Sequence, residues 1–114
     1  APTYTEATPF TLWNKPYVKK PVISREGASI EIIRENKISK SKYDLYSDFL
    51  SVYQKHIELP KLNVILNNEF TEKHYIIGSF VCNDNAVGLS CRLGDEITEW
   101  ESHWLAVSYL REGD

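Results

Sequence analysis

The stretch that decides the predicted fold spans residues 41–57 and reads SKYDLYSDFLSVYQKHI. Its apolar residues recur three or four positions apart, the spacing that gives a helix one apolar face. These positions are Leu45, Phe49, Leu50, Tyr53 and Ile57. Ser41 and Asp44 are spaced as in a capping box, and Pro60 prevents continuation of a helix past the end of the stretch. We therefore expect one helix that begins at Ser41.

Strand patterns lie on both sides of this expected helix. Residues 17–25 and 28–35 predict two strands around Gly27, followed by a polar loop at residues 34–40. The strands expected after the helix are 62–66, 73–82, 86–93 and 103–110, although apolar spacing from Ile97 onward also fits a helix. The order is strand, strand, helix and four strands. This order predicts an α+β fold, with a single helix packed on a mostly antiparallel sheet of five or six strands.

The length of 114 residues predicts a single domain over residues 1–114. Four of the five prolines fall within residues 1–21, so residues 1–16 are expected to form an irregular, proline-rich arm. Aromatic residues in and next to the arm, such as Phe10 and Trp13, should pack it on the body. No apolar run approaches the roughly 20 residues that span a bilayer, and we expect no contact with membranes.

Charge is distributed unevenly along the chain, although the net charge is only −3. Residues 15–42 carry eight basic and three acidic side chains, and residues 93–114 carry six acidic side chains and one basic one. Such opposite poles fit two solvated faces that attract each other within the fold. They also fit one pole that docks a partner of opposite charge.

The two cysteines, Cys82 and Cys91, flank the expected turn at residues 83–85. A tight hairpin there places them too far apart for a disulfide, which needs Cα atoms within about 7 Å. Free thiols favour a cytoplasmic location slightly over a secreted one. The histidines and cysteines show no metal-ligand spacing, and the glycines form no nucleotide-binding motif, so neither a metal nor a cofactor is expected.

The acidic segment near the C-terminus is the predicted binding surface. Acidic residues surround Trp100 there, and Trp104 follows closely. A tryptophan among carboxylates suits a basic protein partner, because the indole anchors the contact and the acids steer association. The predicted binding residues are Asp95, Glu96, Glu99, Trp100, Glu101 and Trp104. The function expected from them is a non-enzymatic protein-binding module, such as an inhibitor or an immunity-type protein.

Three alternatives remain open at this point. A small ribonuclease-like enzyme would use His74, Arg92 and His103 with Glu69, since such residues supply a base, an acid and a cation for RNA cleavage. A structural or self-associating subunit is the second alternative, and the oligomeric state is left open. The third is a weak anion site at Lys40, Ser41 and Lys42 around the expected helix start. Nucleic acid is a less favoured partner because the net charge is negative.

Overall fold

In the computed structural model, which describes residues 1–113, the stretch at residues 41–57 contains a strand where a helix was expected. Strand β5 runs over Ser51–Lys55, and the residues before it form bends and turns. The only helix among the described residues is α1, the four residues Thr8–Thr11. The prediction of an α+β fold with one helix packed on a sheet is therefore wrong. Apart from α1, the regular secondary structure of the described residues consists of antiparallel strands.

The physical reason is a set of hydrogen bonds that hydrophobic periodicity does not reveal. The Oγ of Ser41 accepts a hydrogen bond from the backbone N–H of Ile30 (2.9 Å). An Oδ of Asp44 accepts one from the hydroxyl of Ser29 (2.7 Å). The two residues that were expected to cap a helix are thus bonded to another part of the chain. The β-branched and aromatic residues of β5 then suit a strand, since tertiary pairing overrides a weak helix propensity.

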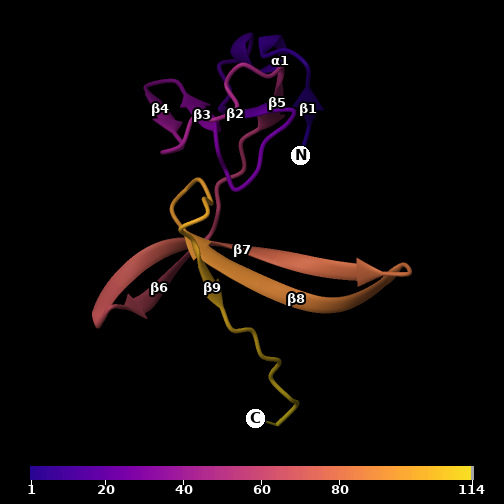
Figure 1. Cartoon of the computed structure of the whole chain (residues 1–114), viewed down its shortest axis with the longest axis vertical. Helices are drawn as coiled ribbons and strands as arrows, with labels where there is room; N and C mark the ends of the chain where they lie inside the picture. The colour runs from indigo at the N-terminus through magenta and orange to yellow at the C-terminus, as the bar shows by residue number, and fades with distance from the viewer. Residues whose placement is uncertain (114) are drawn as a thin grey trace. The chain divides into compact units, whose positions relative to one another are not determined.

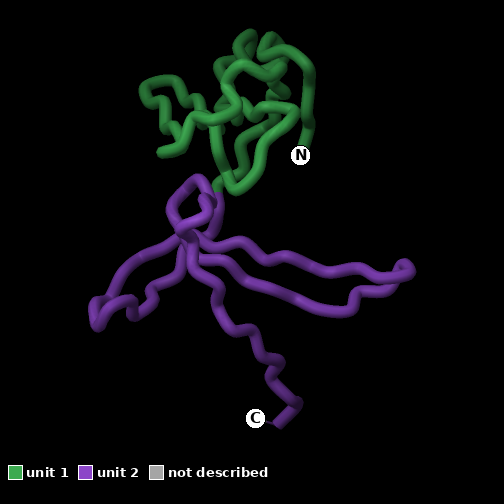
Figure 2. Tube along the Cα trace, in the orientation of Figure 1, with its two compact units in different colours: residues 1–58 green, residues 59–114 purple. Residues whose placement is uncertain are grey.

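The chain divides into two units, Ala1–Glu58 and Leu59–Asp114, which are coloured separately in Figure 2. Unit 1 contains a five-stranded antiparallel sheet in the order β1-β5-β2-β3-β4 (Figure 1). Its strands are β1 (Thr3–Tyr4), β2 (Tyr17–Pro21), β3 (Glu31–Arg34), β4 (Lys37–Lys40) and β5. The expected strand pair around Gly27 is present but shorter, and the expected loop at residues 34–40 contains β4.

The register of this sheet sorts side chains onto two faces, because directly opposite residues of paired strands project to the same side. Lys19 lies opposite Glu31, so these two define what we term the Lys19 face. Val18 is one position along β2, lies opposite Ile32 and Gln54, and projects to the other face. Val18 and Ile32 are both buried and belong to the core. Lys20, two residues after Val18 on β2, projects to the same face as Val18 and Ile32, which we term the Lys20 face.

The N-terminal segment of unit 1 is held by aromatic contacts. Phe10 in α1 is buried, and its ring stacks on that of Tyr17 with the centroids 5.6 Å apart. Tyr4 of β1 contacts the edge of the same Phe10 ring at 5.5 Å. Segment 1–16 therefore includes a short strand and a short helix, and its buried aromatic ring attaches it to the start of β2.

Unit 2 contains a four-stranded antiparallel sheet in the order β6-β7-β8-β9. Its strands are β6 (Lys61–Leu66), β7 (Glu69–Cys82), β8 (Asn85–Gly94) and β9 (His103–Leu105). The first part of β7 pairs with β6 and the rest with β8, so β7 belongs to two hairpins that run apart in Figure 1. The strands expected at 62–66, 73–82 and 86–93 are confirmed, but only the first three residues of 103–110 are a strand.

The core of unit 2 gathers near the end of β8. Leu93 is 1% exposed, and Cys91 and Ile97 are also buried. Both cysteines are free, as predicted, although only Cys91 is buried. Across residues 1–113 there is no helix of the length and apolar character that crossing a membrane would require.

Candidate functional site

Strand β2 presents two consecutive lysines to opposite faces of the sheet in unit 1. The Nζ of Lys20 donates a hydrogen bond to Oε1 of Gln54 on β5 at 2.6 Å. Both side chains are half-buried, and the amide is neutral, so this contact orients the ammonium group without cancelling its charge. Neither Lys19 nor Lys20 forms an ion pair within residues 1–113. A half-buried, uncompensated ammonium group favours an anionic ligand.

The connection that follows these lysines, residues 22–30, has an unusual backbone. Glu26, Gly27 and Ser29 all have positive φ, at 54°, 74° and 57°. Glycine adopts this region freely, whereas other residues adopt it only where the surroundings hold them there. Turns that place left-handed residues in succession direct backbone N–H groups to one side and form concavities that bind anions. We term residues 22–30 the β2–β3 loop.

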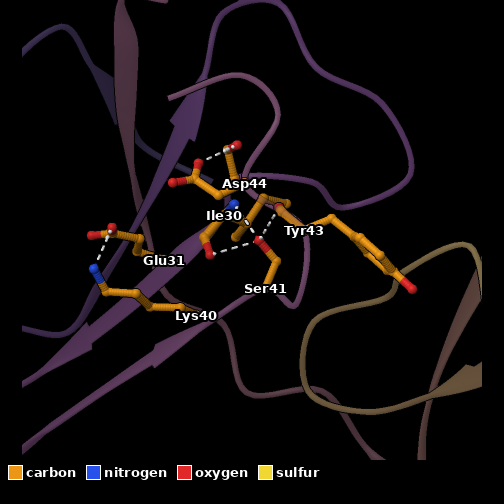
Figure 3. Close-up of polar contacts among 7 residues, drawn as sticks. Ile30, Glu31, Lys40, Ser41, Tyr43 and Asp44 are labelled. Carbon is orange, nitrogen blue, oxygen red and sulfur yellow. Dashed lines mark hydrogen bonds and ion pairs between the residues drawn. The ribbon is translucent and has the colours of Figure 1, made fainter. Parts of the chain in front are cut away.

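The end of the β2–β3 loop is bonded to the segment before β5. The backbone N–H of Ser29 donates to the carbonyl of Tyr43 at 2.7 Å, and its hydroxyl donates to Asp44 at 2.7 Å. The same hydroxyl accepts a hydrogen bond from the N–H of Tyr46 at 2.8 Å. Figure 3 shows the neighbouring contacts, in which Ser41 bonds to the backbone of Ile30.

A small cavity of about 60 Å³ opens on the Lys19 face beneath this loop. Lys19, Lys40 and four serines line it, together with Glu31 and Asp44. Lys40 pairs with Glu31 at 3.0 Å (Figure 3), so Lys19 supplies the unpaired positive charge. The lysine and serine side chains of this lining can hydrogen-bond a small anionic group such as a carboxylate or a phosphate.

The structure places the three residues of the predicted anion site at the end of β4 and just beyond it. Lys40 and Ser41 line the cavity, whereas Lys42 is exposed and is not among its lining residues. The original reason for this site, a helix N-terminus at Ser41, is wrong because no helix begins there. Anion binding at Lys40 and Ser41 stays a prediction, now with Lys19 as the neighbouring cation.

The predicted acidic surface corresponds to the connection from β8 to β9 in unit 2. Its side chains differ widely in exposure: Trp100 and Trp104 are exposed, whereas Glu99 is 7% exposed. Asp95 forms an ion pair with Lys73 at 2.9 Å, and the guanidinium of Arg92 lies over the Trp104 ring at 5.1 Å. The remaining predicted residues are Glu96, which is half-buried, and Glu101, which is exposed. Docking of a basic partner on this segment stays a prediction.

The alternative ribonuclease residues are not brought to one place. His74 on β7 lies opposite Gly94 of β8, and Arg92 lies two residues before Gly94, so His74 and Arg92 share a face. His103 on β9 lies opposite Leu93 and therefore projects to the other face. Glu69 is at the far end of β7, where it pairs with β6. A base, an acid and a cation from this set do not converge on one phosphate.

Sequence reasoning missed the pair of Lys20 and Gln54, which are 34 residues apart. A signal was present, because two adjacent lysines precede Pro21 and a Ser-Arg-Glu-Gly run. The sequence analysis placed Gly27 at a hairpin turn and assigned the two lysines only to the general basic stretch at residues 15–42.

The sequence model of one protein family, described as glutathionylspermidine synthase preATP-grasp, matches residues 1–108 of the chain. This match covers nearly all of the 114 residues and both units. The description names an enzyme, so the prediction of a non-enzymatic inhibitor or immunity-type protein is wrong. The match gives no support to the ribonuclease-like alternative, and self-association stays a prediction. The chain belongs to the glutathionylspermidine synthase preATP-grasp family.

Proposed function

We propose that this protein takes part in the ATP-dependent joining of glutathione to spermidine, and that unit 1 binds phosphate groups of ATP. Condensing a carboxyl group with an amine is unfavourable in water, so a synthase that makes such a conjugate couples it to ATP. Enzymes of phosphoryl transfer act mainly by positioning the phosphates and balancing their charge. The residues of unit 1 fit these two tasks.

The observation that carries the proposal is the contact between Lys20 and Gln54. The neutral amide of Gln54 holds the ammonium group of Lys20 in one place at 2.6 Å and leaves its charge available. Lysine commonly binds phosphate as a compact point charge, and a charge-assisted hydrogen bond is about twice as strong as a neutral one. A lysine held in this way needs little reorganisation when an anion arrives.

The surroundings of Lys20 support the same ligand. Its strand leads directly into the β2–β3 loop, whose left-handed residues suit an anion-binding concavity. Unit 1 carries nine basic and seven acidic side chains, a net charge of +2, whereas unit 2 carries four and nine, a net charge of −5. The field of unit 1 therefore favours a polyphosphate over a cationic ligand.

The test measures binding of a non-hydrolysable ATP analogue with magnesium by isothermal titration calorimetry. Lys20→Met should weaken binding by roughly 10- to 100-fold, since a hydrogen bond to a charged group contributes about 1.5–3 kcal/mol. Lys37→Met is the matched control, because Lys37 is an exposed lysine of β4 on the same sheet. It should bind like the wild type. Equal binding by the Lys20 variant, or no binding by the wild type, would contradict the proposal.

A second variant tests the role of the uncompensated charge. Gln54→Glu places a carboxylate beside Lys20, where the amide oxygen now accepts its hydrogen bond. The ammonium group should stay in position, but its charge would be neutralised by the new ion pair. We expect weaker binding of the analogue and an unchanged far-UV circular dichroism spectrum. Unchanged affinity in Gln54→Glu would show that the charge of Lys20 plays no part.

A further inference from the structure

We infer that Asp44 is a positioning residue, which acts through Ser29 to hold the β2–β3 loop in the conformation that receives phosphate. This inference rests on the proposed function and adds a residue that lies outside the Lys20–Gln54 pair. Asp44 belongs to the irregular segment before β5, fifteen residues after Ser29. Its carboxylate accepts a hydrogen bond from the Ser29 hydroxyl at 2.7 Å, which connects Asp44 to the end of the loop.

Ser29 needs external support because of its backbone. Its φ of 57° lies in the left-handed region, where a residue with a Cβ atom is disfavoured. Three hydrogen bonds offset the conformational energy of this backbone. The N–H of Ser29 donates to the carbonyl of Tyr43, and its hydroxyl donates to Asp44 and accepts from the N–H of Tyr46. A strained residue persists only where its surroundings determine its conformation, and the segment 43–46 provides those surroundings.

The hydroxyl of Ser29 both donates and accepts, so Asp44 determines which way it points. A hydroxyl rotates freely until its partners fix it. With its proton directed at the carboxylate, the oxygen presents a lone pair to the N–H of Tyr46. Without the carboxylate of Asp44, the Ser29 hydroxyl loses the acceptor that fixes the direction of its proton. The last turn of the loop, which includes Ala28 and Ser29, would then lose one of its two side-chain attachments to the segment 43–46.

The consequence for binding is a change in the fraction of molecules with the loop correctly placed. When only a fraction of the protein molecules has the loop in the binding conformation, the observed dissociation constant equals the intrinsic one divided by that fraction. The carboxylate of Asp44 carries the same charge as a phosphate and cannot attract it, so in this arrangement Asp44 acts through Ser29. Its loss should therefore raise the KM for ATP and leave kcat nearly unchanged.

The first measurement examines the loop without any nucleotide. Trypsin cleaves after Arg25, an exposed residue in the middle of the β2–β3 loop, and mass spectrometry reports cleavage of the bond between Arg25 and Glu26. Asp44→Ala should speed this cleavage by about tenfold, because local opening exposes the bond to the protease. Asp44→Asn retains an oxygen that can accept from Ser29 and should restore slow cleavage. Asp48→Ala changes an exposed aspartate of the same segment and should have no effect.

The second measurement connects the loop to the ligand. The affinity for the ATP analogue should fall by about tenfold in Asp44→Ala and recover in Asp44→Asn. Equal cleavage rates in Asp44→Ala and the wild type would overturn the inference, and so would faster cleavage with unchanged affinity. Failure of the proposed function has a different signature, since Lys20→Met would then bind the analogue like the wild type whatever the cleavage rates show.

Discussion

His56, which directly follows β5, has a pKa lowered from its ordinary value of 6.5. Partial burial of the imidazole is the main cause, since burial disfavours the charged form. The positive charge of Arg34 lowers this pKa further, and the negative charge of Glu58 opposes the shift in part. The folded state therefore binds a proton at His56 less readily than the unfolded chain does.

This shift predicts a pH dependence of stability. The unfolded state binds more protons between the folded pKa and 6.5, so the contribution of His56 is fully present above pH 6.5 and is lost as the pH falls. His56→Gln removes this titration. Urea unfolding at pH 7.5 and 5.5 should show a smaller loss of stability in the variant than in the wild type. An equal loss in both proteins would mean that His56 does not contribute.

The state of a single residue could be predicted from the sequence where it depends only on neighbouring residues in the chain. The free state of Cys82 and Cys91 followed from a tight hairpin, and the structure confirms it. Lys20 and Gln54 could not be paired in advance, because their contact depends on the register between β2 and β5. A sequence reports the residue types at such a site, but tertiary pairing decides which of them meet.

At the scale of elements, the segment 41–57 shows how periodicity can mislead. Apolar residues at helical spacing are also compatible with a bend followed by a strand, in which some of them stay exposed. Leu45 and Leu50 are 73% and 83% exposed, which a helix packed on a sheet by this face would not allow. The hairpin strands of unit 2 were easier to predict, because alternation and an Asn-Asp-Asn turn point to the same structure.

The turn of that hairpin carries a prediction about stability. Asn83 and Asp84 have φ values of 49° and 62°, and paired positive φ values of this kind favour glycine at the second position. Asp84→Gly should raise the free energy of unfolding by about 0.5 kcal/mol, because glycine adopts this conformation without a Cβ clash. Guanidinium unfolding of both proteins would measure the difference.

The matched control for this prediction is Asn85→Gly, one residue further along. Asn85 begins β8 and is not among the residues with positive φ, so glycine gains nothing there. Its side chain also donates a hydrogen bond to the carbonyl of Asn83 at 2.9 Å, which the variant loses. Asn85→Gly should be destabilised. Destabilisation of Asp84→Gly by the same amount would contradict the account of the turn.

For the whole molecule, the sequence showed the uneven charge, but its interpretation changed with the structure. The basic stretch at residues 15–42 lies in unit 1, around the β2–β3 loop, and the acidic stretch at 93–114 lies in unit 2. The acidic end was the predicted binding surface because tryptophans accompany it. The uncompensated lysines of β2 instead favour an anion-binding role for the basic unit.

The central claim, that Lys20 meets the phosphates of ATP, is tested most directly by covalent labelling. An ATP derivative with an acyl phosphate transfers its acyl group to a lysine amine near the phosphates, and peptide mass spectrometry identifies that lysine. We predict acylation of Lys20 that excess ATP with magnesium suppresses, while labelling of exposed lysines such as Lys15 and Lys42 is weak and insensitive to ATP. Labelling of the exposed lysines alone, or labelling of Lys20 that ATP does not suppress, would contradict the account.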